Sequence, residues 1–203
     1  MKTWALIVAV KPLSAAKSRL DLSSRLREDL ALAMLEDTLV AVSGVPGIGC
    51  LIVTDDPRAA AVASAAGMTV RSGEPPGGLN VALTYGVLAA RQLWGDVRVA
   101  ALPADLPALR AEELGEALAA ASHHDRGFVT DEDADGTTLL CARRTLQPSY
   151  GKGSASRHRV GGAVMLEGNW PGLRRDVDTL IDLAAAVSIG VGSHTAAMHA
   201  SLS

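Results

Sequence analysis

Three aspartates occupy positions from which carboxylates could hold a divalent metal ion. Asp105 directly follows an apolar run at residues 97–102, and two nearby prolines restrict its backbone. Asp176 and Asp178 are two residues apart, so in an extended segment their side chains point to the same side. Two like charges placed in this way repel each other unless a cation lies between them. Helix capping is the competing role for Asp105 and Asp178, because aspartate is also a favoured N-cap.

A basic loop follows the first apolar run of the chain, residues 4–10. The loop, residues 11–20, carries three cationic side chains and two hydroxyls, which are groups that bind a polyphosphate. It contains no glycine and is therefore neither a Walker A loop nor a dinucleotide-binding fingerprint. An ordinary solvated loop is the alternative. Combined with the aspartates, the loop favours metal-assisted phosphoryl or nucleotidyl transfer.

The composition excludes several other classes of function. The 203 residues include 19 Lys and Arg against 22 Asp and Glu, a net charge of -3, which argues against binding to nucleic acid or to an anionic membrane. Only 3% of the residues are aromatic, too few for a base-stacking platform. No apolar run approaches the ~18 residues of a membrane span. We therefore expect a cytoplasmic protein whose Cys50 and Cys141 are buried and reduced.

Short apolar runs alternate with stretches of helical periodicity up to about residue 130. We expect strands at 4–10, 50–53, 68–70, 97–102 and 127–130, and helices at 25–42, 58–66, 79–93 and 111–121. This alternation predicts an α/β fold, a mostly parallel sheet with helices on both faces, in one domain over residues 1–203. In such a sheet ligands bind beyond the carboxyl ends of the strands, where the basic loop and Asp105 would both lie.

The alternation weakens after residue 131. We expect strands at 137–142 and 163–166 and a helix at 180–187. Residues 147–161 are rich in glycine, serine and basic side chains, and we predict a loop too polar to pack. His158 lies in this segment, which either grips a phosphorylated acid or is a mobile polar loop.

Six short motifs follow one another over nearly the whole chain. They are Lys11-Pro12 with residues 17–20, residues 78–80, residues 105–107, residues 136–138, Gly151 with Ser154, and residues 176–179. In this order they resemble those of a known family, the phosphoenolpyruvate / 2-phospho-L-lactate guanylyltransferases of coenzyme F-420 biosynthesis. The family implies a Rossmann-like nucleotidyltransferase fold, related to the molybdopterin guanylyltransferases, with a small β-hairpin region.

The resemblance also implies an activity and a set of site residues. The family transfers GMP from GTP to the phosphate of a three-carbon acid and releases pyrophosphate; phosphoenolpyruvate is the expected acceptor, giving enolpyruvyl-diphosphoguanosine. It further implies a downstream transferase that takes the unstable product. Carried over by position, two magnesium ions would be held by Asp105 and Asp176 with Asp178 beside them, the acid by Thr137, Gly151 and Ser154, the triphosphate by Lys17 and Arg19, and the guanine or ribose by Gly78, Leu79 and Asn80.

Two departures from the family pattern leave part of this open. Related nucleotidyltransferases carry a glycine-rich loop after the first strand, which this chain lacks, and residues 151–154 contain an extra glycine and lysine. The acceptor is therefore phosphoenolpyruvate, 2-phospho-L-lactate or 3-phosphoglycerate. A nucleotidyltransferase acting on a sugar phosphate or a pterin, and a noncatalytic nucleotide-binding module, are the alternatives. The intact aspartates argue against the last, because a cluster of carboxylates is costly to keep unpaired.

Overall fold

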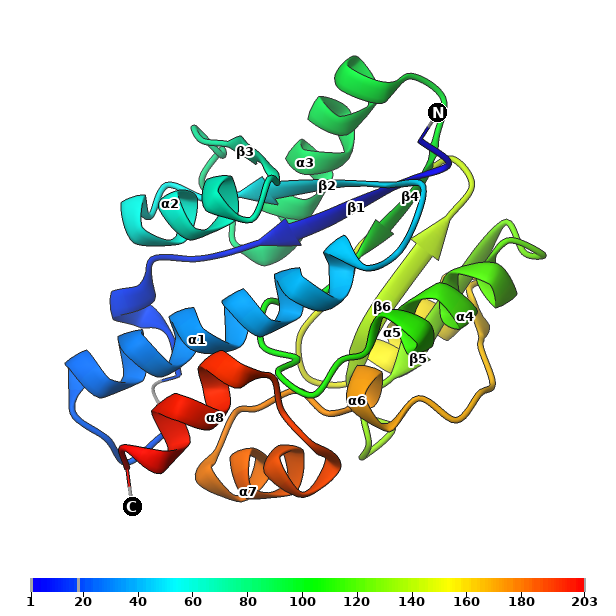
Figure 1. Ribbon diagram of the computed structural model, residues 1–203. Helices are drawn as coiled ribbons and strands as arrows, with labels where there is room; N and C mark the ends of the chain where they lie inside the picture. Colours follow the sequence, from blue (N-terminus) through cyan, green and yellow to red (C-terminus); the bar gives the residue numbers. More distant parts are fainter. Residues whose placement is uncertain (1, 18, 203) are drawn as a thin grey trace.

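The computed structural model describes residues 2–17 and 19–202; Ser18 of the predicted basic loop lies outside this part of the chain. Seven strands form one sheet in the order β3-β2-β1-β4-β6-β5-β7 (Figure 1). The strands are β1 Trp4–Ala9, β2 Ile48–Val53, β3 Thr69–Arg71, β4 Arg98–Ala101, β5 Arg126–Thr130, β6 Thr137–Ala142 and β7 Val164–Met165. The helices are α1 Ser24–Ser43, α2 Pro57–Ala65, α3 Leu79–Trp94, α4 Ala111–Ala121, α5 Ser154–Val160, α6 Pro171–Arg174, α7 Leu180–Ile189 and α8 Ser193–Ala200, with a 3-10 turn at Leu13–Ala15.

The sheet is mostly parallel, as predicted. β1 lies between β2 and β4 and is parallel to both, and β3 continues the parallel part beyond β2. β6 is antiparallel to β4 and β5, while β7 is parallel to β5. The expected hairpin is therefore β5 and β6, and it is built into the main sheet. β6, the second strand of the hairpin, takes the place next to β4.

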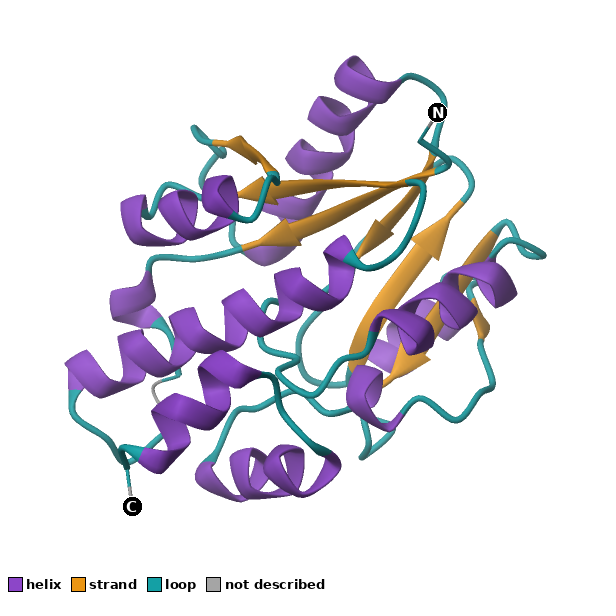
Figure 2. Ribbon diagram, in the orientation of Figure 1, coloured by secondary structure: helices purple, strands orange, loops and turns teal. Residues whose placement is uncertain are grey.

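Helices cover both faces of the sheet (Figure 2). Because successive side chains of a strand point to opposite faces, Leu6 and Val8 of β1 join one apolar cluster and Ala5 and Ile7 join the other. α1, α2, α4 and α6 contribute to the first cluster, and α3 and α5 to the second. The uninterrupted apolar sequence of β1 is thus what a strand buried on both faces requires.

Three helices were not predicted: α5, the four-residue α6, and α8. α5 lies in the segment expected to be too polar to pack, and that expectation was wrong: the helix buries Ser154, Ala155 and His158 and leaves its arginines outside. A helix of seven residues has too few turns to display an apolar period. α8 packs against α1 because buried Asp37 of α1 accepts hydrogen bonds from the backbone N–H groups of His194 and Thr195, at 3.1 and 2.8 Å.

Two smaller expectations concern the cysteines and the membrane. Cys50 and Cys141 are buried and not joined by a disulfide, as predicted, and burial raises the pKa of the Cys50 thiol to about 12. Over residues 2–17 and 19–202, none of the helices combines the length and the apolar character needed to cross a bilayer.

Candidate active site

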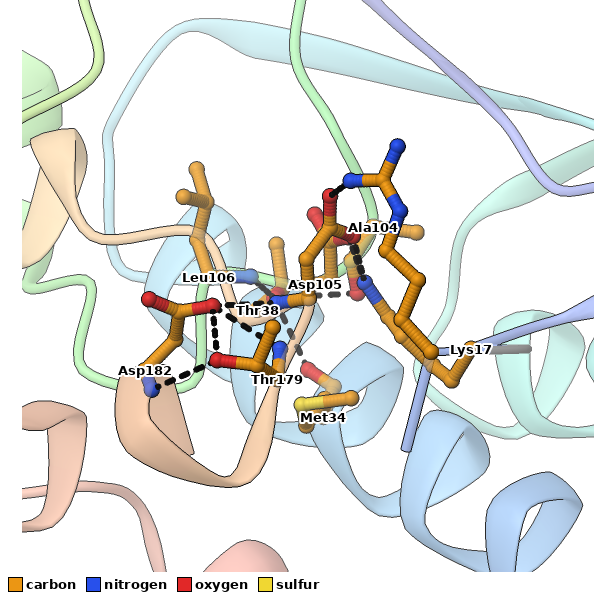
Figure 3. A network of polar contacts seen from close by, with 10 residues as sticks. Lys17, Met34, Thr38, Ala104, Asp105, Leu106, Thr179 and Asp182 are labelled. Carbon is orange, nitrogen blue, oxygen red and sulfur yellow. Dashed lines mark hydrogen bonds and ion pairs between the residues drawn. The ribbon is translucent and has the colours of Figure 1, made fainter. Parts of the chain in front are cut away.

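Asp105 is held at the carboxyl edge of the sheet by contacts on both sides of its backbone. The loop after β4 carries it, and buried Thr38 of α1 binds that loop: its hydroxyl donates to the Met34 carbonyl at 2.8 Å and accepts from the Leu106 N–H at 3.2 Å (Figure 3). On the other side, the Val177 N–H donates to the Asp105 carbonyl at 3.2 Å. This last bond brings the segment with Asp176 and Asp178 against Asp105.

Lys17 joins the predicted basic loop to the aspartates. Its ammonium forms an ion pair with Asp105 Oδ2 and lies 3.1 Å from Asp178 Oδ1 (Figure 3). Arg19 Nη1 lies 3.2 Å from Asp178 Oδ2. Burial lowers the pKa of Lys17, but the charges of Asp105 and Asp178 outweigh it, so the pKa is raised. We call Lys17, Arg19, Asp105, Asp176 and Asp178 the ionic cluster.

Asp176 has the most perturbed carboxyl group of the ionic cluster. Burial raises its pKa to about 7, the negative charges of Asp105, Asp178 and Asp131 act in the same direction, and Lys17 opposes them. The Lys17 ammonium alone therefore does not balance the negative charge gathered here.

The aspartates are not helix caps. α7 is capped by Thr179, whose hydroxyl accepts from the Asp182 N–H at 3.2 Å, and the Asp182 carboxylate accepts from the Thr179 N–H at 2.8 Å. No helix begins at Asp105, and the next one, α4, has Arg110 at its N-cap. The capping alternative is thus wrong for Asp105 and Asp178, and their carboxylates are available to the site.

Oxygen donors of this kind fit a magnesium ion. Mg²⁺ prefers carboxylate oxygens, and Asp105 Oδ1 is buried with no hydrogen-bond partner among the described residues. In this part of the chain no three His, Cys, Asp or Glu side chains are already arranged as a metal site. The carboxylates of Asp105 and Asp178 instead contact the Lys17 ammonium. A bound metal ion would therefore have to share or replace the Lys17 contacts.

The three residues expected to bind the acid lie together at the start of α5. Ser154 is the first residue of this helix, and its N–H donates to the Gly151 carbonyl at 3.0 Å. Gly151 has φ +120°, which disfavours other residues. Thr137 begins β6, and its hydroxyl lies 2.9 Å from Nδ1 of His158, one helical turn after Ser154. We call residues 147–153, which lead into this helix, the acceptor loop.

Asn80 binds the acceptor loop. Its side-chain amide donates to the Tyr150 carbonyl at 3.2 Å and accepts from the Tyr150 N–H at 2.8 Å. The Tyr150 hydroxyl in turn donates to the Ala101 carbonyl, at the end of β4, at 3.0 Å. Both polar groups of the Asn80 side chain are therefore in use. Leu79, by contrast, is exposed, at the first position of α3 after Gly78.

An acidic turn, residues 131–136, connects the two groups of residues. The Asp131 carboxylate accepts from the N–H groups of Asp135 and Gly136, at 3.0 and 2.7 Å, and its charge acts on Asp176. The Asp135 carboxylate accepts from the Gly153 N–H, at 2.9 Å. Sequence reasoning gave this turn no role, although such spacing of aspartates before a glycine is typical of side chains that bind their own backbone.

Lys11 and Leu13 of the basic loop have partners outside the ionic cluster. Lys11 pairs with Glu74 at 2.5 Å, and the Leu13 N–H donates to Asp56 Oδ2 at 2.9 Å. The N–H groups of Ala15 and Ala16 close the 3-10 turn. These two N–H groups therefore bond within the loop itself, whereas the side-chain cations Lys17 and Arg19 contact the aspartates.

Comparison with known proteins gives matches over most of the chain. The family described as "Guanylyl transferase CofC like" matches residues 4–162. A phosphoenolpyruvate guanylyltransferase of Geodermatophilus obscurus is 48% identical over 207 residues, covering 98% of this chain and 94% of the relative. One of Mycolicibacterium paratuberculosis is 48% identical, covering 95% of this chain and 90% of the relative. These relatives carry the same activity in their names.

Solved structures share the fold at low sequence identity. A putative nucleotide-diphospho-sugar transferase from Desulfovibrio desulfuricans superposes with a TM-score of 0.72 at 18% identity, covering 97% of this chain and 94% of its own. A cytidylyltransferase from Leptospira borgpetersenii has a TM-score of 0.63 at 12% identity, covering 100% and 94%. At such identities the likeness establishes the nucleotidyltransferase fold alone.

Replacing Asp176 with asparagine should stabilise the metal-free protein at alkaline pH. The raised pKa of Asp176 means that its ionised form is penalised in the folded state only, so the penalty is absent below about pH 4 and complete above about pH 7. In the presence of a chelator, the free energy of unfolding of Asp176→Asn, measured by urea denaturation, should exceed the wild-type value at pH 8 and approach it near pH 4.

The matched control for this experiment is Asp133→Asn, in the exposed part of the acidic turn. It should change stability little at either pH. An Asp176→Asn protein no more stable than the wild type at pH 8 would contradict the charge account of the ionic cluster.

Proposed function

The chain belongs to the CofC-like guanylyl transferases, and on that premise we propose that it transfers GMP from GTP to the phosphate of phosphoenolpyruvate. The observation that carries the proposal is the 48% identity to a phosphoenolpyruvate guanylyltransferase over 98% of this chain. Five further relatives at 45–48% identity have the same name. The fold and the family agree that the protein is a nucleotidyltransferase.

The chemistry consists of bringing two polyanions together. A phosphate oxygen of the acid attacks the α-phosphorus of GTP, forming a new P–O bond, while the bond from the α-phosphorus to the bridging oxygen breaks and pyrophosphate leaves with its electron pair. The attacking oxygen is already an anion, so no proton has to be removed. Repulsion between the reactants is the main obstacle, and it falls as cations approach.

Lys17 and Arg19 are the cations that this chain offers to the triphosphate. Both lie at the carboxyl edge of the sheet, where ligands of this architecture bind, and both are held by Asp178. The side chain of Lys17 is 8% exposed and that of Arg19 is 75% exposed. Lys17 thus supplies a charge at a fixed position, while Arg19 can reach toward a ligand. Leu79 and the backbone of Asn80, at the start of α3, would border the guanine or ribose, because the Asn80 side chain is already bonded to Tyr150.

Asp105 and Asp176, with Asp178 beside them, would hold two magnesium ions. The support is chemical: oxygen donors, one buried Asp105 oxygen with no partner among the described residues, and negative charge in excess of Lys17. When bound, magnesium neutralises charge on the phosphate oxygens. The aspartates themselves would only hold and orient the metal ions, and they transfer no proton.

Thr137, Gly151 and Ser154 would bind the acid through a hydroxyl and backbone N–H groups at the start of α5. The acceptor region that carries them, residues 131–170, is short, which favours a small acid over a large pterin. 2-Phospho-L-lactate and 3-phosphoglycerate carry the same charged groups, and one hydrogen bond can distinguish them from phosphoenolpyruvate. A downstream transferase that takes the product belongs to the same proposal.

The proposal predicts pyrophosphate release from GTP and phosphoenolpyruvate in the presence of magnesium. Release should be abolished by a chelator and should be much slower with ATP. 2-Phospho-L-lactate and 3-phosphoglycerate, tested in parallel with the downstream transferase present and absent, should release less. Release with 2-phospho-L-lactate alone would overturn the choice of acid, and no release with any of the three acids would overturn the activity.

The substitution Asn80→Ala distinguishes a role of this side chain in holding the acceptor loop from a role in binding the nucleotide. Because the Asn80 side chain holds Tyr150 of the acceptor loop, its loss should raise the KM for phosphoenolpyruvate about tenfold, the effect of 1.4 kcal/mol, and leave the KM for GTP within about twofold. Leu88→Ala, at an exposed position two turns further along the same helix, is the control and should change neither constant. A rise in the KM for GTP alone would instead assign Asn80 to the nucleotide.

A further inference from the structure

His158 lies beneath the acceptor loop and has no part in the chemistry above. Its side chain is 1% exposed and packs against the rings of Tyr150 and Phe128, with centroids 5.4 and 6.1 Å away. Both ring nitrogens are in hydrogen-bond contact, one with the acceptor loop and the other with β6. A buried imidazole used at both nitrogens has a defined tautomer, which can be worked out from its partners.

The partner of Nε2 determines that tautomer. The backbone N–H of Ser149 lies 2.9 Å from Nε2 of His158. A backbone N–H can only donate, so Nε2 must be the unprotonated, accepting nitrogen. The ring is neutral, because burial and the charges of Arg126 and Arg157 lower the pKa of His158 to about 4. Its single N–H proton is therefore on Nδ1.

This assignment determines the direction of the Thr137 hydroxyl. Nδ1 lies 2.9 Å from Thr137 Oγ1 and, carrying the proton, donates to it. The hydroxyl must then direct its own proton elsewhere. Within the described part of the chain, His158 is the only hydrogen-bond partner found for this hydroxyl. Its proton is therefore committed to none of the described groups, and Thr137 is 6% exposed.

We propose that His158 is a positioning residue that fixes the Thr137 hydroxyl as a hydrogen-bond donor to the anionic acid. The inference rests on the proposed function, in which Thr137 binds that acid. An unconstrained hydroxyl can present either its proton or a lone pair to an anion, and only the proton attracts it. By accepting from His158, Thr137 is left with the attractive arrangement before the acid arrives. The Thr137 hydroxyl then loses less rotational freedom when the acid binds.

Two substitutions separate the two contacts of the imidazole. The side-chain amide of Gln can place an oxygen near the position of Nε2 and accept from Ser149, but it leaves nothing near Nδ1. The amide of Asn is shorter and can place an N–H near Nδ1, within reach of Thr137. His158→Gln thus keeps the acceptor-loop contact, whereas His158→Asn keeps the contact that orients Thr137.

The tautomer is tested directly by NMR. In the ¹⁵N-labelled full chain at pH 7, the imidazole nitrogens of His158, assigned by comparison with His158→Gln, should report a neutral ring protonated on Nδ1. A ring protonated on Nε2, or an imidazolium, would overturn the inference. This measurement does not depend on turnover.

Kinetics test the consequence. His158→Gln and Thr137→Val should each raise the KM for phosphoenolpyruvate about tenfold, leaving kcat and the KM for GTP within about twofold, and His158→Asn should be closer to the wild type. The double variant His158→Gln/Thr137→Val should be no worse than Thr137→Val, because the two residues act through one contact. Multiplied effects, equal losses for both substrates, or a His158→Asn no better than His158→Gln would overturn the inference and indicate a purely structural role.

The two proposals can fail separately. Absence of pyrophosphate release by the wild-type protein would overturn the proposed function. The His158 inference would then be decided by the tautomer and by the rise in Tm that phosphoenolpyruvate causes. A rise reduced equally in His158→Gln, Thr137→Val and the double variant supports the inference, and one unchanged in all three overturns it.

Discussion

Mutual repulsion of carboxylates at one edge of the sheet is the constraint around which this protein is built. Asp105, Asp176 and Asp178 come from two distant segments; burial raises the pKa of Asp176 to about 7, and the negative charges of Asp105 and Asp178 act in the same direction. Lys17 offsets part of the cost, and the pKa of this lysine is raised in turn. The negative charge that remains is what a magnesium site needs, because the metal ion supplies the missing positive charge and can then hold a polyphosphate.

Contacts with the surrounding fold hold these charges in place. Buried Thr38 of α1 contacts the Ala104 carbonyl before Asp105 and the Leu106 N–H after it, and the Val177 N–H ties the second aspartate segment to Asp105. The capping box of Thr179 and Asp182 then anchors that segment to α7. None of these contacts involves the carboxylates of Asp105, Asp176 or Asp178. The aspartates of the site are thus held in place by neighbouring residues that have no role in the chemistry.

The sequence predicted the features that local patterns encode. The apolar runs of β1 and β4 indicated buried parallel strands, and the rule that ligands bind beyond their carboxyl ends brought Lys17 and Asp105 together correctly. The sequence did not predict α5, the contact of His158 with Ser149 or the contact of Asn80 with Tyr150. These contacts join residues that are 9 and 70 positions apart. A seven-residue helix with one buried histidine has no periodic signal. This helix is identified only by its tertiary contacts.

Magnesium binding by the nucleotide-free protein is the measurement that tests the charge account most directly. Isothermal titration calorimetry should detect binding to the wild type and an affinity lower by about tenfold or more in Asp105→Asn, which removes a charge and keeps the shape. Circular dichroism should show that the variant is folded. Equal affinities in the two proteins would contradict the account, because the carboxylates would then be gathered for something other than a cation.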